Sequence, residues 1–317
     1  MSNRCVFILP YFGKFNNYFQ LFLNSCAVNK EYDWMIITDN SDPYNYPSNC
    51  NKLSMTFDEM KELAENRLGF KICLSSPYKL CDYKPAYGYI FEEYISNYEY
   101  WGHCDCDLIF GDLNSFLPEL FEKKYDKLFA AGHLTIYKND FGNNRRFMNS
   151  YQGREIYIEA FTTESIYVFD EDMSEYNVHR LFLADGAKVY ETDLSMNPTM
   201  RYARFRRSYY SAKDKRFIWE IYKPARYYWN KGEIVRIIPD GDSIHTQKFI
   251  YCHLQGRVMH TPKGVANSTV YQIMPDRFKI EKEIPKSKKE LGIFTIGCPY
   301  LYWLKVYVKR IKRKIKR

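Results

Sequence analysis

The sequence has no apolar run of roughly 18 residues, so it offers no segment that could cross a bilayer as a helix. Its nine cysteines include no C-x-x-C pair, which argues against a zinc ribbon and a thioredoxin-like redox motif. No signal peptide is recognisable, and unpaired thiols fit a reducing compartment. These absences predict a cytoplasmic protein.

Net charge is also absent from most of the chain. Eight of the 46 Lys and Arg residues lie in the last 13 positions without any acid, and the other 38 equal the 38 Asp and Glu. A body that binds nucleic acid would need a basic face of its own, so we expect no nucleic-acid partner. With 317 residues, 46% of them hydrophobic, the chain can bury a full core.

Short apolar runs alternate with helical patterns over the first 125 residues. Strands are expected within 4–13, 32–40, 51–57 and 99–111, and helices within 14–29, 57–69 and 82–97. The alternation predicts an α/β fold with a mainly parallel sheet. Beyond residue 125 the pattern becomes mixed, with short strands expected within 127–139, 216–238 and 249–259.

Two carboxylates, Asp105 and Asp107, interrupt the aromatic and apolar stretch YWGHCDCDLIFGDL at 100–113. Residues i and i+2 of an extended chain share a face, so both can reach one ligand. Mg²⁺ or Mn²⁺, which prefer hard oxygen ligands, would offset the penalty of burying two charges. A solvated strand end that holds no metal is the alternative interpretation.

Polar clusters follow three of the expected strands. They are Tyr11-Phe12-Gly13, Thr38-Asp39-Asn40 and Asp105-Cys106-Asp107. Ligands of open α/β sheets bind beyond the carboxyl ends of the strands, where these clusters are expected to converge.

The stretch around the D-x-D pair resembles the D-x-D strand of GT-A glycosyltransferases, and YKLCDYKPAYGYIF (78–91) is similar to the helix that precedes that strand. The resemblance extends over roughly residues 4–260. It is closest to uncharacterised capsular polysaccharide biosynthesis glycosyltransferases and more distant from glycosyltransferase families 8 and 32. It implies a Rossmann-like nucleotide-diphospho-sugar transferase fold with a mixed, mainly parallel sheet.

The resemblance also implies roles for single residues. Asp105 and Asp107 would hold Mn²⁺ or Mg²⁺ and the donor diphosphate, and His253 in YCHLQGR would complete the metal shell. The remaining donor contacts would come from Tyr11 at the base, Asp39 at the uracil or ribose, Asp82 at the sugar and Lys84 at the diphosphate or the sugar. For His253, a core histidine is an equally good interpretation.

A second acidic cluster ends the stretch FTTESIYVFDED. Asp170 and Glu171 are candidates for the general base that an inverting transferase needs at the acceptor hydroxyl. A solvated loop is the alternative, and a retaining enzyme would need no such base.

At the C-terminus, Leu304, Val308, Ile311 and Ile315 repeat at helical spacing among the cations. Such a basic amphipathic helix is typical of a membrane-surface anchor, with nucleic-acid binding or a disordered tail as alternatives. The expected organisation is therefore a catalytic domain at 1–265, a C-terminal extension or linker at 266–297 and a helix at 298–317 on an anionic membrane. The anchor would make the protein peripheral on the inner face of the cell membrane.

Together these features predict a hexosyltransferase that moves sugar from a UDP-sugar to a lipid-linked oligosaccharide of a surface or capsular polysaccharide. Two alternatives remain from the sequence. One is a nucleotidyl- or phosphotransferase with the same metal site, and the other is a non-catalytic, membrane-associated binding protein.

Overall fold

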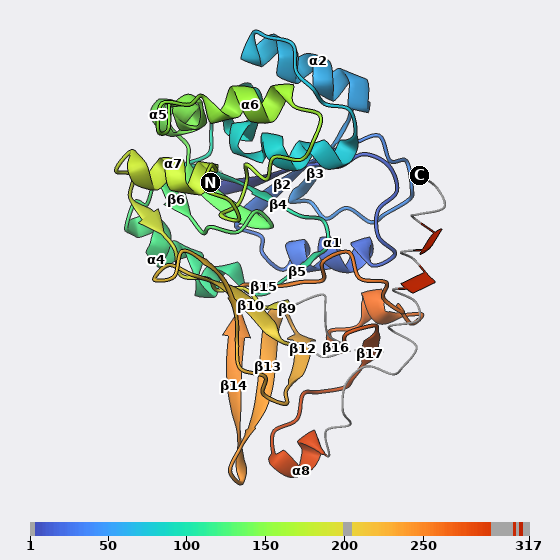
Figure 1. The fold of residues 1–317 in the computed structure, drawn as a ribbon. Coiled ribbons are helices and arrows are strands. Elements are labelled where there is room, and N and C mark those ends of the chain that lie inside the picture. Colours follow the sequence, from blue (N-terminus) through green and yellow to red (C-terminus); the bar gives the residue numbers. More distant parts are fainter. Residues whose placement is uncertain (1–3, 199–204, 293–306, 309–310, 313–317) are drawn as a thin grey trace.

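The computed structural model describes residues 4–198, 205–292, 307–308 and 311–312 (Figure 1). The predicted anchor at 298–317 lies outside the described residues except for Tyr307, Val308, Ile311 and Lys312, which are helical and exposed. Within the described ranges, no helix is both long and apolar enough to span a bilayer. The eight cysteines in those ranges are all free thiols.

A seven-stranded sheet forms the larger part of the molecule. Its order is β3 (Cys50–Ser54), β2 (Tyr32–Thr38), β1 (Cys5–Pro10), β4 (Tyr100–Cys104), β7 (Leu134–Lys138), β6 (Lys127–Leu128) and β8 (Val189–Tyr190). Only β7 runs against its neighbours β4 and β6, and every other adjacent pair is parallel. The α/β fold with a mixed, mainly parallel central sheet is thereby confirmed.

Helices cover both faces of this sheet. Successive side chains of a strand point to opposite faces, and both faces are apolar here. Phe7 and Trp34 face a cluster that includes α1 (Phe19–Ala27) and α4 (Leu117–Glu122). On the other face, Ile8 and Ile37 meet the remaining helices of this half. These are α2 (Phe57–Leu68), the 3₁₀ helix Pro77–Ala86, α3 (Tyr87–Ile90), α6 (Ile156–Thr162) and α7 (Val178–Ala184). In Figure 1, α2 and α6 lie above the sheet and α1 lies below it.

Short elements link these helices and strands. They are the helix α5 (Phe141–Arg145) and the 3₁₀ turns Glu92–Tyr94, Leu113–Ser115 and Arg146–Met148. The helix expected over 82–97 is present in three short pieces: the end of a 3₁₀ helix that begins at Pro77, then α3, then the 3₁₀ turn Glu92–Tyr94. Pro85 lies inside that 3₁₀ helix, where its ring and missing N–H disfavour regular α-helical hydrogen bonding.

The rest of the chain is built from antiparallel strands below the seven-stranded sheet (Figure 1). One sheet contains β11 (Arg216–Trp219), β10 (Arg207–Ser211) and β9 (Asn197–Pro198). Another contains β14 (Ser243–Phe249), β13 (Glu233–Asp240), β12 (Arg226–Asn230), β16 (Val270–Ile273) and β17 (Phe278–Ile280). A third pairs β15 (Tyr251–His253) with β5 (Leu108–Phe110). The 3₁₀ turn Val265–Asn267 precedes β16, and α8 (Lys288–Leu291) follows β17.

Two expectations for this half change. Residues 266–297 are not simply a linker, because β16 and β17 belong to the five-stranded sheet and β16 pairs with β12. The strand expected over 249–259 is limited to β14 and β15. After Leu254, Gln255 and Gly256 adopt left-handed backbone conformations that turn the chain toward Asp107.

Candidate functional site

The D-x-D pair lies where the sheet's strand β4 ends. Asp105, Cys106 and Asp107 connect β4 to β5, which leaves the seven-stranded sheet and pairs with β15. In that register His253 lies opposite Leu108, directly beside Asp107. A histidine almost 150 positions later in the chain is thus brought to the carboxylates by strand pairing.

Asp105, Asp107 and His253 form a compact group of potential metal ligands. Their ligand atoms all lie within 4.8 Å of one another. His253 Nε2 is 3.3 Å from Asp107 Oδ1 and 3.9 Å from Asp105 Oδ2. Asp107 Oδ1 is buried without a hydrogen bond, and such an unsatisfied oxygen in a low-dielectric site favours a cation. Two carboxylates and one imidazole are a suitable donor set for Mn²⁺ or Mg²⁺.

Neighbouring groups orient these ligands. Asn197 Oδ1 lies 3.2 Å from His253 Nδ1, which favours a proton on Nδ1 and leaves Nε2 facing the carboxylates. The amide of Gly256 donates to Asp107 Oδ2. Burial alone would raise the pKa of Asp107. The attraction of a protonated His253 outweighs burial, so this pKa lies below its ordinary value. The Asp107 carboxylate is therefore set to remain ionised.

Lys84 connects the D-x-D pair to the second acidic cluster. Its ammonium is 2.7 Å from Asp105 Oδ1 and 3.2 Å from Asp170 Oδ2, and it donates to the Gly132 carbonyl oxygen at 2.8 Å. Burial would lower the pKa of Lys84, but the two carboxylates outweigh burial and raise it. A fixed positive charge therefore stands beside the candidate metal site.

Asp170 and Glu171 are brought to the same site. Asp170 is buried, and burial, together with Glu171 and Asp105, raises its pKa to about 7, although Lys84 opposes the shift. Burial also raises the pKa of Glu171, which accepts from the Gly132 amide at 3.2 Å. A carboxyl group that titrates near neutral pH can exchange protons with a ligand.

Asp82 occupies a different position from the one expected of a sugar contact. It is completely buried, and its Oδ2 lies 2.7 Å from the Lys79 ammonium. The backbone amides of Tyr167 and Phe169 donate to the same carboxylate at 2.9 and 3.1 Å. Asp82 thus holds the segment that ends in Asp170, so it is a positioning residue here, and a direct sugar contact stays a prediction. The nearby group Cys81, Asp82 and Asp170 does not fit a second metal, since Asp82 is already occupied.

Tyr11 and Asp39 follow β1 and β2 at the same edge of the sheet. Asp39 accepts from the Gly13 amide at 2.7 Å and remains exposed. Tyr11 stacks on Phe15 with ring centroids 4.6 Å apart, and burial, with a contribution from the charge of Asp107, raises its pKa to about 12. The convergence of the three polar clusters is thus visible, while a nucleotide contact by Tyr11 or Asp39 stays a prediction.

Several other residues at the site are not among those that the sequence analysis singled out. Gly132 has no room for a side chain, because an added Cβ would lie 2.3 Å from Asp170 Oδ2. The His133 ring lies against the His253 ring, tilted by 39° with centroids 4.5 Å apart, and its Nδ1 lies 2.6 Å from the Tyr251 hydroxyl. Asn197 and Gly256 support the metal ligands from the antiparallel half. None belongs to a recognisable motif, because each acts through long-range contacts.

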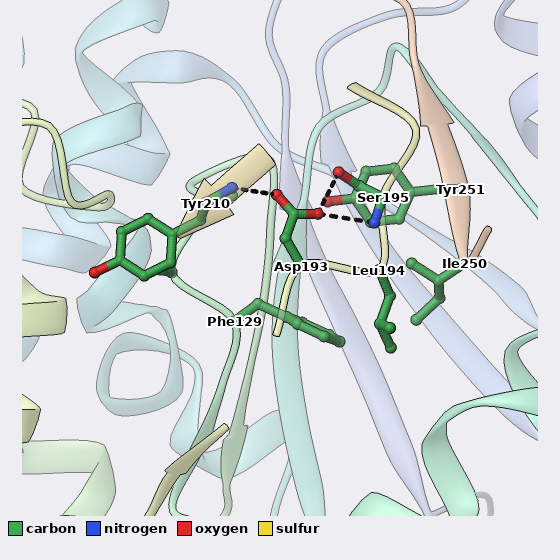
Figure 2. Close-up of a pocket in the computed structure, with 9 residues that line it drawn as sticks. Phe129, Asp193, Leu194, Ser195, Tyr210, Ile250 and Tyr251 are labelled. Atoms are coloured by element: carbon green, nitrogen blue, oxygen red, sulfur yellow. Dashed lines mark hydrogen bonds between the residues drawn. The ribbon is translucent and has the colours of Figure 1, made fainter. Parts of the chain in front are cut away.

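A small cavity of about 10 Å³ lies behind Tyr251 (Figure 2). Asp193 lines it and accepts from the Ser195 hydroxyl at 2.6 Å, the Ser195 amide at 2.8 Å and the Tyr210 amide at 2.9 Å. The volume suits one water at most, so this cavity is structural support for β15 and not a substrate pocket.

One family model, described as a family of unknown function (DUF6625), matches residues 7–282. The chain belongs to this family. The match covers both sheet regions of this DUF6625 protein and every site residue named above. No curated protein matches the sequence.

Among solved structures, the galactosyltransferase LgtC in complex with donor and acceptor sugar analogues is similar to part of the DUF6625 chain. The similarity covers 61% of this chain and 75% of that one, with 11% identity and a TM-score of 0.33. A likeness this low determines neither activity nor substrate. The relation to capsular glycosyltransferases therefore stays a prediction.

Proposed function

We propose that this protein is a metal-dependent, GT-A-like glycosyltransferase that takes a hexose from a UDP-sugar. The observation that carries the proposal is the group of Asp105, Asp107 and His253 at the carboxyl edge of a mainly parallel sheet, with an unsatisfied buried oxygen on Asp107. A nucleotide diphosphate is the ligand that such an edge and such a donor set suit together.

The side chains divide the task. Asp105, Asp107 and His253 would hold Mn²⁺ or Mg²⁺, which supplies charge stabilisation to a departing diphosphate. Lys84 adds a fixed positive charge next to them, and Asp39 and Tyr11 line the edge where the nucleoside would lie. Asp170 has a pKa near neutrality and is placed to handle a proton on an acceptor hydroxyl.

The acceptor is proposed to be a lipid-linked oligosaccharide of a surface or capsular polysaccharide. Support comes from the basic amphipathic pattern at 298–317, which would hold the enzyme at the inner face of the cell membrane. Such an acceptor is confined to the membrane surface, so an enzyme held there would meet it at a high local concentration.

Calorimetric titration with UDP tests the binding half of the proposal. Wild-type protein should bind UDP with Mn²⁺ or Mg²⁺ and lose it in EDTA, and Asp107→Asn should lose metal-dependent binding. Asp58→Asn makes the same change in the exposed first turn of α2 and should bind normally. UDP affinity that is equal in EDTA and in Mn²⁺ would contradict the metal site.

A screen of UDP-sugars with Mn²⁺ tests the chemistry. Slow release of UDP and free hexose, accelerated by a glycan acceptor, is the expected result. Release of pyrophosphate or of a phosphosugar would indicate a nucleotidyl- or phosphotransferase. Metal-dependent UDP binding without any turnover would indicate a non-catalytic binding protein.

A further inference from the structure

Three large apolar side chains are exposed between residues 219 and 222, where the β10–β11 hairpin ends. Ile221 is 81% exposed, Trp219 42% and Tyr222 38%. They lie at the end of β11 and in the loop that leads to β12. Exposure of apolar side chains to water is unfavourable. Clusters of exposed apolar residues therefore mark interaction surfaces.

Exposed cations lie in the same segment, at the hairpin turn and directly after the apolar side chains. Between residues 213 and 223 four cationic side chains are exposed: Lys213, Lys215, Arg216 and Lys223. Asp214 is the exposed acid of this segment, whereas Glu220 is partly buried in an ion pair with Arg236, 2.6 Å apart. The surface of the 213–223 segment is therefore both apolar and positive.

The hairpin is fixed to the candidate site. The Tyr210 hydroxyl donates to Asp172 at 2.6 Å, and Arg180 pairs with Asp172 at 2.6 Å. Arg180 also donates to the Lys215 carbonyl oxygen at 3.3 Å. Asp172 follows Asp170 by two residues, so whatever the 213–223 segment binds is held close to the acidic cluster.

We propose that the 213–223 segment docks on an anionic lipid surface. Lipid headgroups supply the negative charge that the four cations match, and the acyl boundary accommodates Trp219, Ile221 and Tyr222. Nucleic acid would match the cations but would leave the aliphatic Ile221 in water. Docking here is separate from the predicted C-terminal anchor and does not require glycosyltransferase activity.

Co-sedimentation of the full-length protein with phosphatidylglycerol vesicles tests the proposal. Ile221→Asp should weaken binding about tenfold or more, because it replaces an inserted apolar group with a charge that the vesicle repels. Ile280→Asp makes the same replacement at another exposed isoleucine, on β17, and should pellet like the wild type. If Ile221→Asp also pellets like the wild type, the proposal is wrong and docking belongs elsewhere, such as residues 298–317.

A matched pair of charge reversals tests the electrostatic part. Lys215 and Lys124 are both exposed turn lysines with left-handed backbone, at φ 49° and 51°. Lys215→Glu should lose about fivefold or more in vesicle affinity, and Lys124→Glu should lose much less. Equal losses, equal binding to neutral phosphatidylcholine vesicles, or retention on an oligonucleotide in place of vesicles would each overturn the proposal.

Discussion

The region from β1 to β8 and the region from β9 to β17 reach the candidate site in different ways. The first places its carboxylates at strand ends, where Asp105 and Asp107 follow β4 directly. The second contributes groups that complement those charges, His253 from β15 and the Gly256 amide from the next turn. Acids that are local in sequence thus depend on distant partners.

The two regions also differ in how they use buried charge. In the α/β region, Lys79, Asp82 and Lys127 are completely buried and bound to backbone or side chains. In the antiparallel region, Arg236 is paired with Glu220, which remains partly exposed. Breaking a buried contact in the first region should therefore have the larger effect.

The largest effect is expected from Asp82→Ala. The substitution leaves the Lys79 ammonium buried without its carboxylate and frees the amides of Tyr167 and Phe169. We expect the free energy of unfolding to fall by about 3–5 kcal/mol. Chemical denaturation measures it, with the exposed Asp58→Ala as the control. An unchanged midpoint would contradict the positioning role and return Asp82 to a direct sugar contact.

Lys127 provides a test of pH dependence. Burial lowers its pKa from 10.5 to about 7, so between those values the unfolded chain binds the extra proton. The contribution of Lys127 to the free energy of unfolding therefore rises with pH between about 7 and 10.5. Below pH 7 the folded protein carries the full cost of burying the charged ammonium. Lys127→Met removes the penalty.

The difference in the free energy of unfolding between Lys127→Met and the wild type should thus shrink by roughly 3 kcal/mol between pH 7 and pH 10. Denaturation at several pH values, compared as the difference between the two proteins, measures it. A constant difference across that range would show that Lys127 keeps its ordinary pKa in the folded protein.

Asn197→Ala tests whether the antiparallel region tunes the metal ligands. Loss of the Asn197 oxygen leaves His253 Nδ1 without its partner, so Mn²⁺ affinity should fall about tenfold or more. Asn197→Asp keeps an accepting oxygen and should retain most of the affinity. Calorimetric titration with Mn²⁺ measures both affinities. Equal affinities for Asn197→Ala and the wild type would show that Asn197 does not influence metal binding.

The smallest effect concerns a helix far from the site. Thr56 and Glu59 form a reciprocal capping box at the start of α2. Thr56→Ala should reduce the free energy of unfolding by about 1 kcal/mol and leave Mn²⁺ affinity unchanged. Thermal unfolding measures the first and calorimetry the second. A change in metal affinity would show that α2 is coupled to the site.

Part of this protein could be predicted from its sequence because the signals are local. Alternating apolar runs and helical patterns are fixed by neighbouring residues, so the mainly parallel sheet and α2, which ends at Gly69, follow from short segments. The D-x-D pair is local in the same sense. The helical pattern over 82–97 is local too, although Pro85 makes its first part a 3₁₀ helix.

Tertiary structure alone decided which groups meet. The resemblance alone proposed His253 as a third ligand, and only the pairing of β15 with β5 shows how it comes to lie beside Asp107. Asn197, Gly132 and His133 had no pattern at all, and only the fold shows that the buried Asp82 carboxylate also holds the 167–172 segment. Sequence determines the periodicity and end of each strand, but contacts between residues over 100 positions apart depend on register and packing, which no local pattern encodes.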